Sequence, residues 1–147
     1  MTGVSGRTFR GDVLVPGMAQ GQATVLDEPL SFWGGVDSST GVIVDRRHPQ
    51  VGSSLQGRVL LMPSGRGSSS SSSVLAEAIR AGAAPAAILL LRPDPIVALG
   101  AMVGSELYGA SLPVLVMGEE DYRCIQTGCL VSARADERRA EVHLEED

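Results

Sequence analysis

Residues 63–73 join a glycine-rich turn to a run of serines, and these residue types are the ones in this chain best suited to chemistry. The segment reads Pro63-Ser64-Gly65-Arg66-Gly67 and continues as serines from Ser68 to Ser73. Glycines let a backbone approach a ligand closely, and the N–H groups at the start of a helix attract negative charge. Serine is also a preferred residue at a helix N-terminus. With Arg66 as a bidentate clamp, the segment predicts a site for a carboxylate or a phosphate.

Other chemistries for this segment stay open on the residues alone. Gly65-Arg66-Gly67 is followed neither by Gly-Lys-Ser nor by a correctly placed third glycine, so it is neither a Walker A loop nor a dinucleotide-binding fingerprint. A serine hydroxyl is a weak base or nucleophile without an activating neighbour. The only histidines are His48 and His143. A hydrolase triad remains possible, with its acid drawn from Asp37, Asp45 or Asp94.

A run of serines is also typical of a flexible linker, and the chain would then be an interaction scaffold. Its position favours an ordered loop instead. An apolar strand is predicted over 58–62 and an amphipathic helix over 74–79, ending before Gly82. Connections from a strand to the next helix are short and ordered, so we expect the serines to lead into the helix.

The pattern of elements changes near residue 58. The first part reads as β-structure, with strands over 8–14, 23–26 and 42–44 and a turn over 17–22. The second part alternates strands and helices. After the helix over 74–79 we predict a strand over 86–91, a helix over 96–107 that starts near Pro95, and a strand over 112–117. A short helix over 119–125 and strands over 130–131 and 142–144 complete the predicted elements. The sequence therefore predicts a single α/β domain spanning residues 1–147.

Composition excludes several functions. The net charge of −5 and the lack of a basic stripe argue against a nucleic-acid partner. No apolar run is long enough to span a membrane and no secretory leader is recognised, so we expect a cytoplasmic protein without a membrane partner. Cys124 and Cys129 match no zinc or C-x-x-C spacing, and we expect no metal site in this chain.

Three motifs occurring in one order make the sequence recognisable. They are Ser31-Phe32-Trp33-Gly34-Gly35-Val36-Asp37, the stretch 45–49, and the glycine-serine loop 63–69. Together they resemble the swivel domain, or small subunit, of the aconitase X family. The resemblance covers roughly residues 11–116 and implies a swivelling β/β/α fold like the mobile C-terminal domain of aconitases.

The resemblance also implies roles for residues of the loop. Gly65-Arg66-Gly67-Ser68-Ser69 is similar to the aconitase loop whose first serine is the catalytic base, which gives that role to Ser68. Gly65, Arg66, Gly67 and Ser69 would then bind the substrate. Ser70 stands where aconitases have an arginine, so the cation that stabilises the serine alkoxide would be Arg66 or a residue of the partner.

The implied enzyme is a hydro-lyase that is inactive without its large subunit. In the family that subunit carries the iron–sulfur cluster or metal that activates the departing hydroxyl, and no cofactor is expected in this chain. Trp33, Gly34, Gly35 and Asp37 would line the subunit interface or the substrate entrance. Trp33 could equally be a core residue, and Asp37 could instead cap a turn with Ser38 and Ser39.

Family members act on cis-3-hydroxy-L-proline or on mevalonate 5-phosphate. All the basic residues are arginine, which suggests a GC-rich bacterium rather than a thermophilic archaeon and favours the hydroxyproline type of small hydroxy-acid substrate. A function of another class also remains: a non-catalytic module whose loop binds an anionic metabolite.

Overall fold

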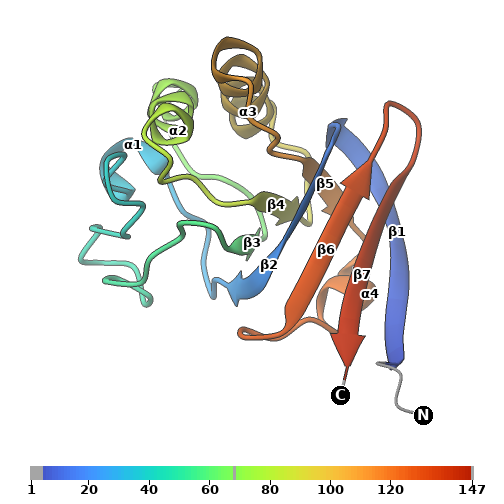
Figure 1. Ribbon diagram of the computed structural model, residues 1–147. Coiled ribbons are helices and arrows are strands. Elements are labelled where there is room, and N and C mark those ends of the chain that lie inside the picture. Colours follow the sequence, from blue (N-terminus) through green and yellow to red (C-terminus); the bar gives the residue numbers. More distant parts are fainter. Residues whose placement is uncertain (1–4, 68, 147) are drawn as a thin grey trace.

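The fold is described from a computed structural model, which covers residues 5–67 and 69–146 (Figure 1). Its elements, in chain order, are β1 (Ser5–Val15), β2 (Gly17–Val25), α1 (Phe32–Gly35), β3 (Val59–Met62), α2 (Ser71–Arg80), β4 (Ala87–Leu90), α3 (Pro95–Tyr108), β5 (Val114–Met117), α4 (Glu119–Tyr122), β6 (Leu130–Ala135) and β7 (Ala140–Glu146).

All the strands join one closed barrel in the order β1-β5-β4-β3-β2-β6-β7, with β7 pairing back onto β1. The strands β2, β3, β4 and β5 run parallel to one another. The remaining pairs, formed by β1, β6 and β7 with their neighbours, are antiparallel. The barrel is therefore half parallel and half antiparallel, and α2 and α3 both cover its parallel side (Figure 1).

The parallel strands β3, β4 and β5 are apolar along their whole length because each of their faces meets a core. Leu60 and Met62 point toward α2 and α3, where they pack with Leu75. Val59 and Leu61 point into the barrel. This burial on both faces is what the continuous apolar runs predicted, and the predicted strands and helices of the second part of the chain are confirmed.

The helices α2 and α3 lie in close contact because two glycines of α3 face α2. A Cβ atom at Gly100 would lie 2.8 Å from the backbone oxygen of Ser72. A Cβ atom at Gly104 would collide with the side chain of Ile79. The start of α2, where the serines lead into the helix, is thus held against α3.

Two predicted elements of the first part were wrong. Residues 17–22 are not a turn: they form most of β2, because Gly17 to Gln22 pair with β6 in a regular antiparallel ladder. Residues 42–44 do not form a strand, since Val42 and Ile43 make only isolated bridges to Ser54 and Val36. No helix among the described residues has the length and apolar character needed to cross a bilayer.

Candidate functional site

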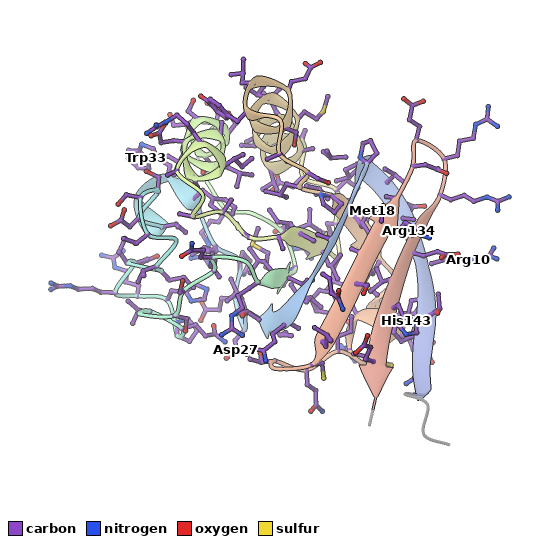
Figure 2. The ribbon with its side chains drawn as sticks, in the orientation of Figure 1. Arg10, Met18, Asp27, Trp33, Arg134 and His143 are labelled. Carbon is purple, nitrogen blue, oxygen red and sulfur yellow. The ribbon has the colours of Figure 1, made fainter. Side chains whose placement is uncertain are left out.

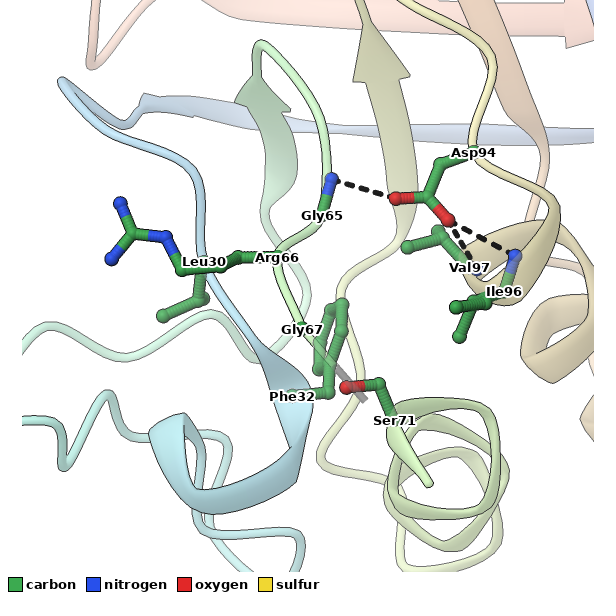
Figure 3. Close-up of a pocket in the computed structure, with 9 residues that line it drawn as sticks. All are labelled: Leu30, Phe32, Gly65, Arg66, Gly67, Ser71, Asp94, Ile96 and Val97. Carbon is green, nitrogen blue, oxygen red and sulfur yellow. Dashed lines mark hydrogen bonds between the residues drawn. The ribbon is translucent and has the colours of Figure 1, made fainter. Parts of the chain in front are cut away.

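A small pocket of about 80 Å³ opens where the chain leaves β3 and β4 (Figure 3). Ligands of α/β proteins commonly bind at this edge, beyond the carboxyl ends of parallel strands. The pocket walls come from the loop after β3, the loop after β4, the segment before α1 and the first turn of α2. Its lining residues are Leu30, Phe32, Gly65, Arg66, Gly67, Ser71, Asp94, Ile96 and Val97.

The glycine turn is fixed to both neighbouring segments. Gly65 forms a parallel bridge with Leu30, and the N–H of Arg66 donates to the Leu30 carbonyl over 3.1 Å. The N–H of Gly65 donates to Asp94 Oδ2 over 2.9 Å. Gly67 has a φ of +91°, a conformation that favours glycine. The N–H groups of Gly65 and Arg66 are therefore used within the protein, and these two do not serve as donors to an anion.

The serines after the glycine turn lead directly into α2. The carbonyl of Ser69 accepts hydrogen bonds from the N–H and the hydroxyl of Ser72, at 3.3 and 2.9 Å. Ser70 precedes the helix with helical dihedral angles. The described serines therefore form a turn and the first turn of a helix, as expected, rather than a linker. Ser68, the predicted base, lies outside the described residues.

Ser71 ties α2 to the motif that contains Trp33. Its side chain is only 4% exposed, and its Oγ accepts the Trp33 N–H over 3.1 Å. The Ser71 Oγ also lies 3.2 Å from Ser31 Oγ, and the Ser31 hydroxyl donates to the Trp33 carbonyl over 3.0 Å. These hydroxyls act as structural links, which agrees with the expectation that Ser71 belongs to the helix entry rather than to the chemistry.

Two arginines flank the glycine turn, and both are exposed. Arg66 points away from Ser71 and Asp94 (Figure 3), with its Nη2 lying 3.6 Å from Glu28 Oε1. Arg92, in the loop after β4, donates from Nη2 to Ser64 Oγ over 3.3 Å. An exposed ion pair of this kind is weak, so the Arg66 guanidinium can leave Glu28 for a stronger anionic partner.

The residues of the predicted interface or entrance do not share one environment. Trp33 is 58% exposed and projects from α1 beside the start of α2 (Figure 2), so it is not a core residue. Gly34 has a φ of +79°, and Gly35 is buried, with a Cβ atom at that position lying 3.3 Å from Leu30 Cδ1. Asp37 accepts hydrogen bonds from the N–H and the hydroxyl of Ser39, at 2.9 and 2.7 Å. Its carboxylate therefore caps a turn, and these hydrogen bonds hold the pKa of Asp37 below its usual value.

The histidines are not arranged for a hydrolase triad with the loop. His48 is buried under its own turn, where Nδ1 accepts from the Gln50 N–H and Nε2 donates to the Glu28 carbonyl. His143 lies on β7 beside Thr8, on the part of the barrel away from α2 (Figure 2). The candidate acid Asp94 has backbone N–H groups as its partners.

Within the described ranges, no group of three or more His, Cys, Asp or Glu side chains is placed to hold a metal ion. Cys124 and Cys129 form no disulfide, and the Cys124 thiol donates to the Glu120 carbonyl. The donor groups of the described residues therefore do not fit an iron–sulfur cluster.

The sequence interpretation did not connect two residues of the loop after β4 with the glycine turn: Asp94, which lines the pocket, and Arg92, which contacts Ser64. Both lie in Arg92-Pro93-Asp94-Pro95, directly after the predicted strand over 86–91. An aspartate before a proline at the start of a helix is a recognisable N-cap. This signal predicts the cap of α3, but it places Asp94 beside Gly65 only once β3 and β4 are known to be adjacent and parallel.

Comparison with known proteins agrees with this geometry. Residues 8–142 match the family described as the aconitase X swivel domain. Over 130 residues the chain is 48% identical to the cis-3-hydroxy-L-proline dehydratase of Pseudomonas aeruginosa, a match that covers 88% of this chain but 22% of that protein. It is 36% identical to the phosphomevalonate dehydratase small subunit of Methanosarcina mazei, covering 88% of this chain and 86% of that one.

The fold is also that of a solved relative. The crystal structure of aconitase X from Thermococcus kodakaraensis in its holo-form aligns with a TM-score of 0.83 at 33% identity, covering 95% of this chain and 99% of that chain. The aligned region thus includes both the barrel and the helices α2 and α3. The chain belongs to the aconitase X swivel-domain family.

Proposed function

We propose that this chain is the small subunit of an aconitase X-type hydro-lyase, which removes water from a small hydroxy acid. The observation that carries the proposal is the place of the glycine turn and of the start of α2 at the carboxyl edge of the parallel strands, in a chain of this family. The pocket is small and open, as expected for one half of an active site whose other half is supplied by a large subunit.

In the proposed reaction Ser68 is the base. Its oxygen takes a proton from the carbon next to the substrate carboxylate, and the electron pair of that C–H bond forms the new C=C bond. The hydroxyl on the neighbouring carbon leaves with the electrons of its C–O bond as hydroxide and takes up a proton from solvent to become water, while Ser68 releases the proton that it has taken to solvent. The residues on either side of it in the sequence, Gly67 and Ser69, belong to the glycine turn and to the turn that leads into α2.

The start of α2 supports the base chemically. A serine oxygen that gives up its proton bears a negative charge, and the N–H groups and dipole at a helix N-terminus stabilise such a charge. Since Ser70 stands at the position of the aconitase arginine, Arg66 or a cation of the large subunit supplies the remaining positive charge. Arg66 can do so by exchanging Glu28 for the anion.

The proposal assigns the iron–sulfur cluster or metal of the enzyme to the large subunit. The lack of a suitable group of ligands among the described residues supports that assignment. Trp33 and the glycines after it line the interface or the substrate entrance, which fits the exposure of the indole beside the pocket. The unpaired cysteines are in keeping with a cytoplasmic location.

For the substrate we favour cis-3-hydroxy-L-proline, because the relative that acts on it shares 48% of the aligned residues. The alternative is mevalonate 5-phosphate, since relatives of that type have a separate small subunit of similar length. The first relative is one long chain of which this chain spans 22%. The difference between the two types therefore lies partly in how the domain is joined to its partner.

Co-expression with an aconitase X large subunit from the same genome tests the proposal. The purified pair should form a complex and release water from cis-3-hydroxy-L-proline, whereas each chain alone should be inactive. Turnover of mevalonate 5-phosphate instead would select the alternative substrate. Tight calorimetric binding of a carboxylate or phosphate by this chain alone, with no activity in the complex, would show an anion-binding module and contradict the proposal.

A further inference from the structure

We infer that Asp94 is a positioning residue of the catalytic loop, through which the loop after β4 fixes the loop that carries the base. The inference rests on the proposed function for its kinetic consequence, but its structural part concerns this chain alone. The Asp94 side chain joins the glycine turn to the start of α3, and the dashed lines of Figure 3 show its contacts with both segments.

The two carboxylate oxygens of Asp94 have separate tasks. Oδ1 accepts the N–H groups of Ile96 and Val97, at 3.0 and 3.1 Å, which caps the start of α3. Oδ2 accepts the Gly65 N–H over 2.9 Å. An ordinary N-cap needs only the first set of contacts. The second contact reaches across to another loop and is not required for α3 to begin.

Gly65 is shaped for this contact. A Cβ atom at residue 65 would lie 2.6 Å from Asp94 Oδ2 and 3.0 Å from Val97 Cγ2. Its φ does not lie in the left-handed region, so the close approach of Asp94 is what requires glycine here. Gly65 and Asp94 therefore form a matched pair, in which a missing side chain on one loop makes room for the carboxylate of the other.

The contact fixes the end of the loop that is opposite to α2. Hydrogen bonds from Ser72 to Ser69 hold the end at the helix, while Asp94 and Leu30 hold the end at Gly65 and Arg66. Ser68 stands between these two anchors in the sequence. Proton abstraction depends steeply on the position of the base, and a displacement of about 1 Å can lower the rate about 100-fold.

Asp94→Ser separates the two tasks. Serine caps a helix about as well as aspartate, but its hydroxyl is too short to reach Gly65 while capping α3. In the isolated chain we expect the Gly65 amide to exchange with solvent at least about 10-fold faster, with the Ile96 and Val97 amides changed little. In the two-subunit enzyme we expect kcat to fall about 10- to 100-fold with little change in KM and an unchanged complex.

A second variant tests the pairing directly. Gly65→Ala should slow the wild-type enzyme, but it should slow the Asp94→Ser enzyme much less, because the atom that its Cβ meets most closely is gone. Asp12→Ser, an exposed aspartate on β1, is the control and should leave all readouts unchanged.

Three outcomes would overturn the inference: an unchanged Gly65 amide in Asp94→Ser, a normal kcat in that variant, or additive effects of the two substitutions. A different result is that the Gly65 amide loses its protection in Asp94→Ser while even the wild-type complex shows no dehydratase activity. That result would support the structural role of Asp94 and would contradict only the proposed function. The amide measurement and the activity measurement thus separate the two claims.

Discussion

Individual side chains of this site divide into those that build turns and those left for chemistry. The sequence allows Asp37 to be a turn cap or a substrate contact, and in the structure its carboxylate accepts hydrogen bonds from both donors of Ser39. Ser71 likewise accepts a hydrogen bond from the backbone N–H of Trp33, and Ser31 donates one to its carbonyl. Short polar side chains next to backbone N–H groups usually serve such local purposes.

The turn at Asp37 makes a prediction about acid stability. Because its folded pKa is lowered by Ser39, Asp37 stabilises the folded protein above the unfolded pKa of about 4, and this stabilisation is lost as pH falls through the folded pKa. In Asp37→Asn the decrease in Tm between about pH 7 and about pH 3 should therefore be smaller than in the wild type.

Thermal unfolding at the two pH values checks this, with Glu106→Gln, an exposed acid on α3, as the control. Equal decreases in Tm for wild type and Asp37→Asn would show that the Ser39 hydrogen bonds do not stabilise the turn. Normal activity of the variant in the complex at neutral pH would place Asp37 outside the substrate contacts.

Sequence patterns could predict the cap at Asp37 as one of two roles, but they could not connect Asp94 with Gly65. The first depends on residues two positions apart, which any turn brings together. The second joins residues of different loops, and it follows only once β3 and β4 are known to be adjacent and parallel. The order of these strands is a tertiary property.

At the scale of elements, the position of α2 against α3 determines where the serine loop ends. Gly100 allows the backbone of Ser72 to approach α3, so a methyl group there must move the start of α2. Helix periodicity predicted both helices, but not that a glycine inside α3 marks their contact. A glycine within a helix is normally a weak point, and here its packing explains it.

Gly100→Ala should lower the free energy of unfolding by about 1–3 kcal/mol, as overpacking of a close contact does, even though alanine is the better helix former. Chemical denaturation measures this. Glu106→Ala, at an exposed position of the same helix, should change stability by less than about 0.5 kcal/mol. If Gly100→Ala were as stable as the wild type, α2 and α3 could move apart to admit the methyl group without any loss in the free energy of unfolding, and the close contact would not stabilise the protein.

The strands of the first part were the least predictable elements for a physical reason. Gly17 and Gly21 in β2 resemble turn residues, yet Gly17 approaches Ser111 and Pro113 and Gly21 approaches Gly57 so closely that a Cβ atom would not fit. These glycines are required by neighbours distant in the sequence. The strands β3, β4 and β5 are continuous apolar runs that can be recognised without knowledge of their neighbours, and their prediction is confirmed.

At the scale of the whole molecule, the barrel closes because the two ends of the chain pair with each other and with the parallel sheet. The strand β1 bridges β5 and β7, and β6 pairs with β2. Alternating patterns predicted some of these strands but not their pairing, since pairing between distant segments leaves no local pattern. The resemblance to a known family supplied the architecture that periodicity could not.

This architecture places the glycine turn of residues 65–67 at the carboxyl edge of the parallel strands. Its neighbours there are the exposed Trp33 and the exposed arginines Arg66 and Arg92. A loop held at the edge of a sheet is suited to present a base to a site that another subunit completes. The central claim is therefore that Ser68 acts in the chemistry and not in folding or assembly.

The most direct measurement is the kcat of the two-subunit enzyme carrying Ser68→Ala, compared with Ser73→Ala, an exposed serine of the same run. We predict that Ser68→Ala lowers kcat by at least about 100-fold, as loss of a general base does, while the complex still assembles and KM changes little. Ser73→Ala should retain normal turnover. Normal turnover by a Ser68→Ala complex would contradict the account.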